Sequence, residues 1–192
     1  MSDAGRPARA GRAAVALLCA ILPAGCGGGH GGGGSPAPGL TCGGTTASAT
    51  DRIRFDCPAG SGSPMGVRVA IGQTTSTNIY GIKFDVVFDP AVVDFDPPAI
   101  EGTFLDQDGS GTAMEAGTAS NDPGRLVVSV TRVGDVGGVG VTGAEKIVIT
   151  LPFTGVASGT TTLAFENAEA VDPGGVAIAG IQFSGPVDLT FP

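Results

Sequence analysis

The sequence predicts an all-β protein, folded as a β-sandwich or jelly roll of eight or nine mostly antiparallel strands. From about residue 64, apolar residues recur at every second position in short runs, which is the period of a half-buried strand. The 34 Gly and 14 Pro are spread between these runs, as the turns of an all-β domain require, apart from one dense patch near residue 30. Residues 143–149 carry too many β-branched side chains to form a helix, and we find no amphipathic pattern longer than two helical turns.

Six runs carry the strand pattern most clearly, and in each the alternate apolar residues are expected to face the core. The expected inward positions are Val67, Val69 and Ile71, then Ile82, Phe84, Val86 and Phe88, then Leu126, Val128 and Val130, then Ile147, Ile149, Leu151 and Phe153, then Leu163 and Phe165, and finally Val187, Leu189 and Phe191. Between the second and third runs, Asp89 and Pro90 predict a corner, and Val92, Val93 and Phe95 an apolar return.

The first 25 residues read as an export signal. Arg6, Arg9 and Arg12 precede an apolar stretch over residues 13–22, which is too short to span a membrane as a helix. The stretch ends in "LPAGC", which resembles the lipobox of bacterial lipoproteins, and that resemblance implies lipidation at Cys26. An ordinary cleaved signal peptide is the alternative. Gly27 is not the Asp that tends to retain lipoproteins at the inner membrane, which favours the outer membrane or cell surface.

The remaining cysteines form a pair. Cys19 leaves with the signal and Cys26 would carry lipid, so Cys42 and Cys57 remain to form a disulfide in an oxidising compartment. A metal pair is the alternative, but no His or further Cys lies near enough in sequence to complete such a site. No metal or other cofactor is therefore expected.

A Gly-rich linker over residues 26–41 would tether the domain to the lipid anchor, the only expected contact with a membrane. It holds His30, the sole histidine, which has no fixed neighbours that would make it a catalytic base or a metal ligand. Without the signal the chain keeps 7 basic and 17 acidic residues, because three Arg and one Asp of the 10 and 18 are removed. A net charge near −10 repels nucleic acid, so we expect no nucleic-acid partner.

The order of motifs over residues 65–192 resembles a cohesin domain. The matching elements are an alternating strand that ends in an Asp-Pro corner, a Gly-rich loop that feeds a strand ending in Phe, and a Gly-Thr-Thr strand followed by an Asp-Gly turn. They are carried by Phe88, Asp89, Pro90, Val92 and Val93, by Gly143 and residues 146–153, and by Gly159, Thr160, Thr161, Leu163, Asp172 and Gly175.

The resemblance implies a nine-stranded antiparallel jelly-roll sandwich, related in fold to carbohydrate-binding modules, whose best-studied members bind dockerins. One sheet face would present a mixed polar and apolar surface to the partner. The candidate outward residues are Lys83, Asp85, Val87, Ser129 and Thr131, although an ordinary solvated strand face would show the same pattern. The sequence does not establish whether residues 42–64, which carry the disulfide, pack on the sandwich.

Other functions are weighed against protein binding. Catalysis is not expected, because the one His lies in the linker and the carboxylates between Asp94 and Asp108 fall in a polar loop. Binding to polysaccharide is the alternative, although the chain has no Trp and one Tyr, Tyr80, to offer a sugar. Residues 106–117 resemble a calcium loop but end in Gly117, where a bidentate acid is required.

The sequence therefore predicts a non-catalytic, lipid-anchored cell-envelope protein. Its sandwich would mediate protein binding or adhesion, with a dockerin-like or other envelope protein as partner. The alternative is a carbohydrate-binding module linked to polysaccharide degradation.

Overall fold

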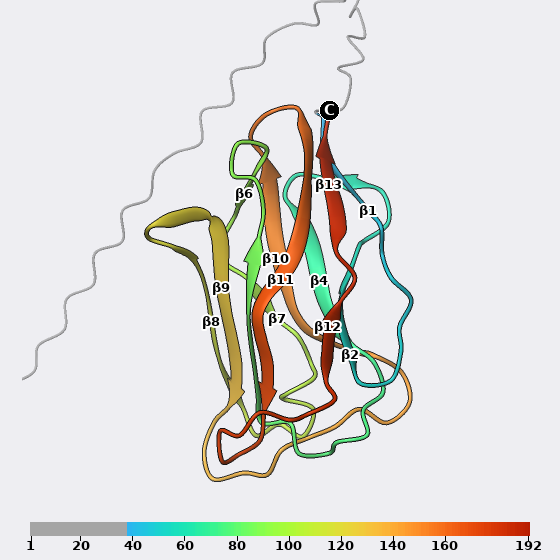
Figure 1. Cartoon of the computed structure of the whole chain (residues 1–192), viewed down its shortest axis with the longest axis vertical. Coiled ribbons are helices and arrows are strands. Elements are labelled where there is room, and N and C mark those ends of the chain that lie inside the picture. Colours follow the sequence, from blue (N-terminus) through green and yellow to red (C-terminus); the bar gives the residue numbers. More distant parts are fainter. Residues whose placement is uncertain (1–37) are drawn as a thin grey trace, which may run out of the picture. The chain divides into compact units, whose positions relative to one another are not determined.

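The computed structural model describes residues 38–192, and these form an all-β sandwich of two sheets (Figure 1). The first, here called the seven-stranded sheet, has the order β3-β1-β13-β11-β5-β9-β8. Its strands are β1 (Leu40–Gly43), β3 (Ser61–Gly62), β5 (Gly81–Val87), β8 (Thr112–Ala119), β9 (Asp122–Arg132), β11 (Gly159–Val171) and β13 (Val187–Phe191).

The second sheet, here called the six-stranded sheet, has the order β12-β2-β4-β10-β6, with β7 also paired to β10. Its strands are β2 (Arg52–Asp56), β4 (Met65–Ile71), β6 (Val93–Phe95), β7 (Ile100–Glu101), β10 (Lys146–Gly155) and β12 (Gln182–Ser184). The pairs are antiparallel except for β12 with β2, which is parallel.

The prediction of an all-β jelly-roll sandwich is confirmed, but the predicted count of nine antiparallel strands is too low. The structure has thirteen strands in its described part. The extra strands are short, and β3, β7 and β12 have only two or three residues each, too few to show an alternating pattern.

The sandwich begins before residue 65. Strand β1 pairs with β13 and with β3, and β2 pairs with β4, so the segment that carries the disulfide supplies strands to both sheets. Ile53 and Phe55 of β2 are fully buried. The question that the sequence left open for residues 42–64 is therefore answered: this segment is part of the core.

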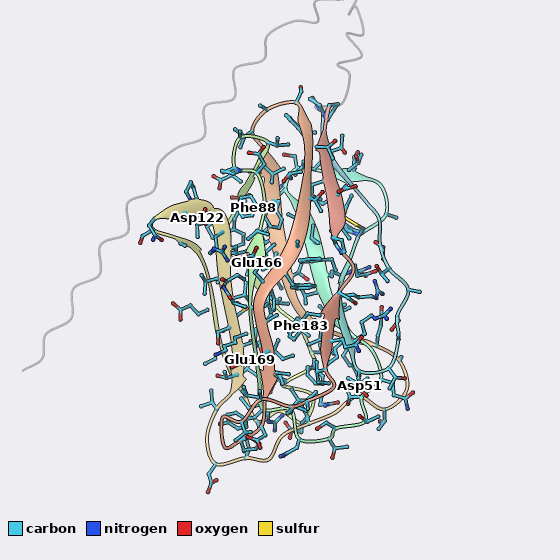
Figure 2. All side chains as sticks on the ribbon, in the orientation of Figure 1. Asp51, Phe88, Asp122, Glu166, Glu169 and Phe183 are labelled. Atoms are coloured by element: carbon cyan, nitrogen blue, oxygen red, sulfur yellow. A yellow bond between two sulfur atoms is a disulfide. The ribbon has the colours of Figure 1, made fainter. Side chains whose placement is uncertain are left out.

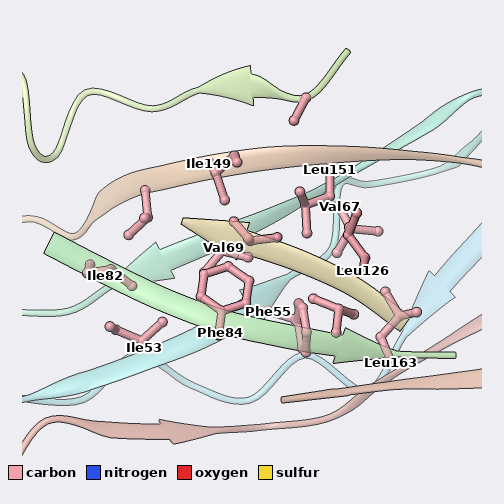
Figure 3. Packing of buried hydrophobic residues seen from close by; sticks show 14 of the residues in the cluster. Ile53, Phe55, Val67, Val69, Ile82, Phe84, Leu126, Ile149, Leu151 and Leu163 are labelled. Carbon is pink, nitrogen blue, oxygen red and sulfur yellow. The ribbon is translucent and has the colours of Figure 1, made fainter. Parts of the chain in front are cut away.

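The core lies between the sheets, and most of the expected inward positions are buried in it. Phe84 of β5 lies at its centre together with Phe55, Val69 and Ile82 (Figure 3). Because side chains alternate across a strand, each of these residues directs the next one to the outer face of its sheet. The buried row of β5 therefore fixes which of its residues can meet a partner.

One expected inward residue is misplaced. Ile147 was expected in the core, yet Val148 is buried and Ile147 is only half-buried. A β-bulge between Ile147 and Ile149 inserts one residue into β10, so the alternation changes phase there. Phe104 and Gly102 donate backbone hydrogen bonds to the carbonyl groups of Ile147 and Val148 at this bulge.

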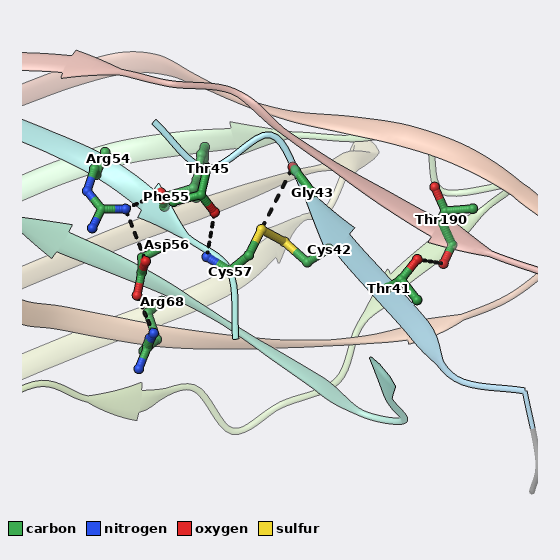
Figure 4. Close-up of a disulfide and its surroundings, with 10 residues drawn as sticks. All are labelled: Thr41, Cys42, Gly43, Thr45, Arg54, Phe55, Asp56, Cys57, Arg68 and Thr190. Carbon is green, nitrogen blue, oxygen red and sulfur yellow. Dashed lines mark hydrogen bonds and ion pairs between the residues drawn. A yellow bond between two sulfur atoms is a disulfide. The ribbon is translucent and has the colours of Figure 1, made fainter. Parts of the chain in front are cut away.

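The predicted disulfide is present. Cys42 of β1 is bonded to Cys57, which follows β2, and the Cα atoms are 5.5 Å apart (Figure 4). Because β1 and β2 belong to different sheets, the bond joins the two layers. The backbone N–H of Cys57 also donates to Oγ1 of Thr45 at 3.1 Å.

The signal over residues 1–25, the lipidation site Cys26 and His30 lie outside the described residues, as does most of the linker over 26–41. In residues 38–192 the structure contains no helix that is long and apolar enough to cross a membrane.

Candidate functional site

Two strands that are distant in sequence meet in register on the outer face of the seven-stranded sheet. Lys83 lies opposite Ser129, Asp85 opposite Val127, and Val87 opposite Arg125. The neighbouring strand β8 adds Glu115 opposite Ser129. We call the outer surface of β8, β9, β5 and β11 the outer face.

The five residues predicted for a binding surface all lie on this outer face, but they differ in exposure. Lys83 is exposed, whereas Val87, Ser129 and Thr131 are half-buried. Asp85 was expected to face outward, and it does lie on this face, but it is only 9% exposed because other side chains cover it. Arg125 Nη1 donates to Asp85 Oδ2 at 2.8 Å, and Asn167 Nδ2 donates to the same oxygen at 2.7 Å.

Arg125 is the centre of a cluster of carboxylates. Besides Asp85, it donates to Glu166 Oε2 at 2.7 Å and to Asp122 Oδ2 at 3.3 Å. Figure 2 shows Glu166 on β11 and Asp122 at the hairpin between β8 and β9. The hydrogen bonds that Arg125 donates to Glu166 and then to Asp85 raise the pKa of Arg125 above its ordinary value, so the guanidinium stays charged. The cluster ties β5, β9 and β11 together across the outer face.

A β-bulge in β11 brings Asn167 to Asp85. The pairing of β11 with β5 shifts register between Glu166 and Glu169, and Asn167 takes a left-handed φ of 48° there. Asn tolerates this conformation better than other residues with a Cβ, and bulges commonly turn a side chain toward a site. After the bulge, Glu169 lies opposite Lys83, and the two form an ion pair at 2.6 Å.

A hollow of about 320 Å³ opens on the outer face between these ion pairs. Its floor is formed by Val127 and by the strands at Phe84 and Val128, whose side chains point into the core, and its polar border by Lys83, Asp85, Ser129 and Asn167. A second hollow of about 260 Å³ lies on the other side of Ser129 and is bordered by Ala113, Met114, Glu115 and Thr131.

Val127 makes the outer face partly apolar. Its side chain is 46% exposed, although the neighbouring inward residues of β9 are fully buried. Unlike the other exposed valines, Val127 also lines the larger hollow, among the polar groups of Lys83, Asp85 and Asn167.

Sequence reasoning missed the contribution of β11 and of Arg125. In the structure Phe165 and Ala170 both pack toward the core although they lie five residues apart, and this odd spacing requires the extra residue of a bulge. The sequence alone does not show that both residues face inward, so the bulge at Asn167 was not predicted. The partners of Arg125 were not predicted either, because they come from elements up to 41 residues away.

The loop that resembles a calcium site is organised by an arginine. Asp106 Oδ1 accepts from the backbone N–H of Gly111 at 2.7 Å, and Asp108 Oδ2 accepts from Arg132 Nη2 at 2.6 Å. The hydrogen bond from Arg132 lowers the pKa of Asp108 to about 2. Nowhere in residues 38–192 do three or more His, Cys, Asp or Glu residues gather as metal ligands.

The aromatic residues mostly pack on one another. Phe55 stacks on Phe165 with ring centroids 4.0 Å apart, and Phe84 and Phe183 approach the same ring at an angle. A small hollow of about 150 Å³ reaches Phe165 and Phe183 between β11 and β12. Tyr80 donates its hydroxyl to the carbonyl group of Gly134 at 2.8 Å.

Comparison with known proteins finds similarity in structure alone. No protein-family model matches the sequence, and a comparison with curated proteins finds no match. The fold resembles type II cohesins of Acetivibrio cellulolyticus. The second type II cohesin module of its ScaA scaffoldin has a TM-score of 0.55 at 16% identity, over 71% of this chain and 87% of that chain.

Two further structures from this bacterium agree with that fold. A type II cohesin domain of its cellulosome has a TM-score of 0.54 at 18% identity, over 70% of this chain and 92% of that chain. A chain from a type II cohesin–X–dockerin complex has a TM-score of 0.54 at 15% identity, over 69% of this chain and 93% of that chain. The sandwich therefore has a cohesin-like fold.

Proposed function

We propose that this chain is a cell-envelope lipoprotein whose cohesin-like sandwich is a non-catalytic protein-binding module, with the outer face as its binding surface. The observation that carries the proposal is the outer face itself. An exposed valine and two hollows lie among charged side chains that are held in place by ion pairs. A surface of this kind offers apolar area with a fixed polar border, which is the anatomy of a protein interface.

The fold likeness supports the same class of partner. One of the similar chains comes from a complex that contains a dockerin. A dockerin-like module or another envelope protein is therefore the partner class that we propose for this chain. Adhesion would follow from the same surface when the partner belongs to a neighbouring cell.

Membrane attachment through Cys26 rests on the lipobox alone. Acyl chains at this cysteine would anchor the protein firmly, because each buried methylene contributes about 0.8 kcal/mol. The outer membrane or cell surface is the proposed location, because Gly27 is not the Asp that tends to retain lipoproteins at the inner membrane.

The carbohydrate-binding alternative has weaker support from the structure. Sugar platforms use broad exposed aromatic rings, but one face of Phe165 is already covered by Phe55, and the hydroxyl of Tyr80 is already bonded. The hollow beside Phe183 is the place where such binding would occur.

A capture experiment separates these functions. The full chain, immobilised by its C-terminus, is exposed to envelope extract and in parallel to insoluble polysaccharides, each with and without a chelator. A matched pair of variants maps the surface: Val127→Arg changes the outer face, and Val156→Arg makes the same change at a valine that is 56% exposed outside it. Capture that Val127→Arg abolishes and Val156→Arg leaves intact supports the proposal. Retention on polysaccharide, or capture that is unaffected by both variants, contradicts it.

A further inference from the structure

The larger hollow on the outer face is rich in hydrogen-bond acceptors. Both hydrogen bonds to Asp85 end on Oδ2, so Oδ1 keeps its capacity to accept. Asn167 uses Nδ2 to reach Asp85, so its amide oxygen is also an acceptor on the border of the hollow. Ser129 adds a hydroxyl between this hollow and the smaller one.

The two cations nearest to Asp85 on the outer face, Lys83 on the border of the hollow and Arg125 beside it, are already paired. Lys83 pairs with Glu169, and Arg125 is shared by three carboxylates. This part of the outer face carries five carboxylates against two cations, an excess of three negative charges, with Asp85 lining the larger hollow and Glu115 the smaller one. The carboxylates are Asp85, Glu115, Asp122, Glu166 and Glu169.

The shape of the hollow suits a long side chain with a charged end. Val127 supplies an exposed apolar side chain to the hollow, and Asp85, which is 9% exposed, stands at its border. Lys and Arg side chains bury an apolar stem and present donors at the tip. Asp85 is already paired with Arg125 through Oδ2, but a cationic side chain could add a charge-assisted hydrogen bond to its other oxygen, Oδ1.

We infer that this hollow receives a lysine or arginine side chain of the partner protein, with Asp85 Oδ1 and the Asn167 amide oxygen as acceptors and Val127 against the stem. The inference rests on the proposed function for the claim that the guest belongs to a protein. The smaller hollow also offers an acidic group, because Glu115 lines it together with Ala113, Ser129 and Thr131. A partner that presents two basic side chains along one edge would fill both hollows.

The test uses small molecules that stand for the side chain. Amide chemical shifts of the ¹⁵N-labelled full chain are followed by NMR while n-butylammonium, n-propylguanidinium, n-butanol or butyrate is added at millimolar concentrations. The two cations are expected to give saturable shifts at Asp85, Val127, Ser129 and Asn167, at least several-fold stronger than butanol gives, and butyrate is expected to give none. Added salt should weaken the cation response, because part of the attraction is electrostatic.

Variants make the result specific to the hollow. Asp85→Asn removes the charge but keeps the shape, and should reduce the cation preference to the level of butanol. Because Asp85 also holds Arg125, the second variant is Val127→Arg, which places a guanidinium over the exposed floor and should block both cations. Val156→Arg should change nothing.

Two outcomes overturn the inference: equal shifts from butanol and butylammonium, or no saturable shift at these amides. Failure of the inference can be told apart from failure of the proposed function. A protein captured through the outer face but not competed by either cation leaves the function standing and removes the basic anchor. Cation binding without any captured protein would support the basic anchor site and would contradict the proposed protein-binding function.

Discussion

Removal of the bond between Cys42 and Cys57 should lower the stability of the sandwich by a measurable amount. The bond joins β1 of one sheet to the end of β2 of the other, across a sequence separation of 15 residues. Closing a loop of that length is worth about 3 kcal/mol on the chain-entropy model. Without the disulfide, the pairing of β1 with β13 consists of only three residue pairs. For a domain of this size, that loss should lower Tm by about 6–12 °C.

The assay is thermal unfolding followed by circular dichroism, for the wild type and the double variant Cys42→Ala/Cys57→Ala, each with and without reductant. Reduced wild type keeps both sulfur atoms, so it isolates the bond from the packing of the half-buried cysteines. The double variant should match the reduced wild type and should not respond to reductant. A double variant that unfolds within about 2 °C of the oxidised wild type would refute the view that this bond is a major constraint between the sheets.

Four further predictions concern the core, the bulge at Asn167 in β11, the loop in which Arg132 binds Asp108, and the lipid anchor. Phe84→Ala should cost about 3–5 kcal/mol in chemical unfolding because it empties the centre of the core, whereas Val156→Ala should cost almost nothing; equal costs would contradict the assigned core. Asn167→Val should cost about 1–3 kcal/mol more than Asn167→Gly, because a β-branched residue does not tolerate the left-handed φ, and similar unfolding midpoints would argue against the bulge. Since Arg132 lowers the pKa of Asp108 from 3.8 to about 2, the stabilisation is complete above about pH 4 and is lost as the pH falls toward 2, so Asp108→Asn should flatten the decline of Tm between pH 4 and pH 2. Cys26→Ala should move the protein from the membrane fraction to the soluble fraction on cell fractionation, and continued membrane association would exclude the lipid anchor.

The sequence predicts the fold where the strands are long and their alternation is regular. The buried rows of β5 and β9 were found because Ile82, Phe84, Val128 and Val130 follow a strict period of two. The short strands and the phase change at Ile147 were missed. A bulge depends on where the chain must bend against its neighbours, and nothing in the local residue types at Ile147 marks it.

The candidate site was predicted only in part, because strand alternation shows which face a residue lies on but not which residues contact it. Alternation places Lys83, Val87 and Ser129 on the outer face, but it says nothing about what covers each of them. Asp85 is covered by Arg125 and Asn167, which come from two other strands. Contacts of this kind are set by strand order and register, and these follow from the packing of the whole sandwich rather than from any short stretch.

The measurement that tests the central claim most directly is site-specific photo-crosslinking on the full chain in its native cells. A photoreactive amino acid is placed at Val127 on the outer face, or at the exposed Gln182 of β12 in the other sheet as the control. A binding face on β8, β9, β5 and β11 predicts a discrete protein adduct from position 127 and none from position 182. Adducts of equal yield from both positions, or an adduct from position 182 alone, would contradict it.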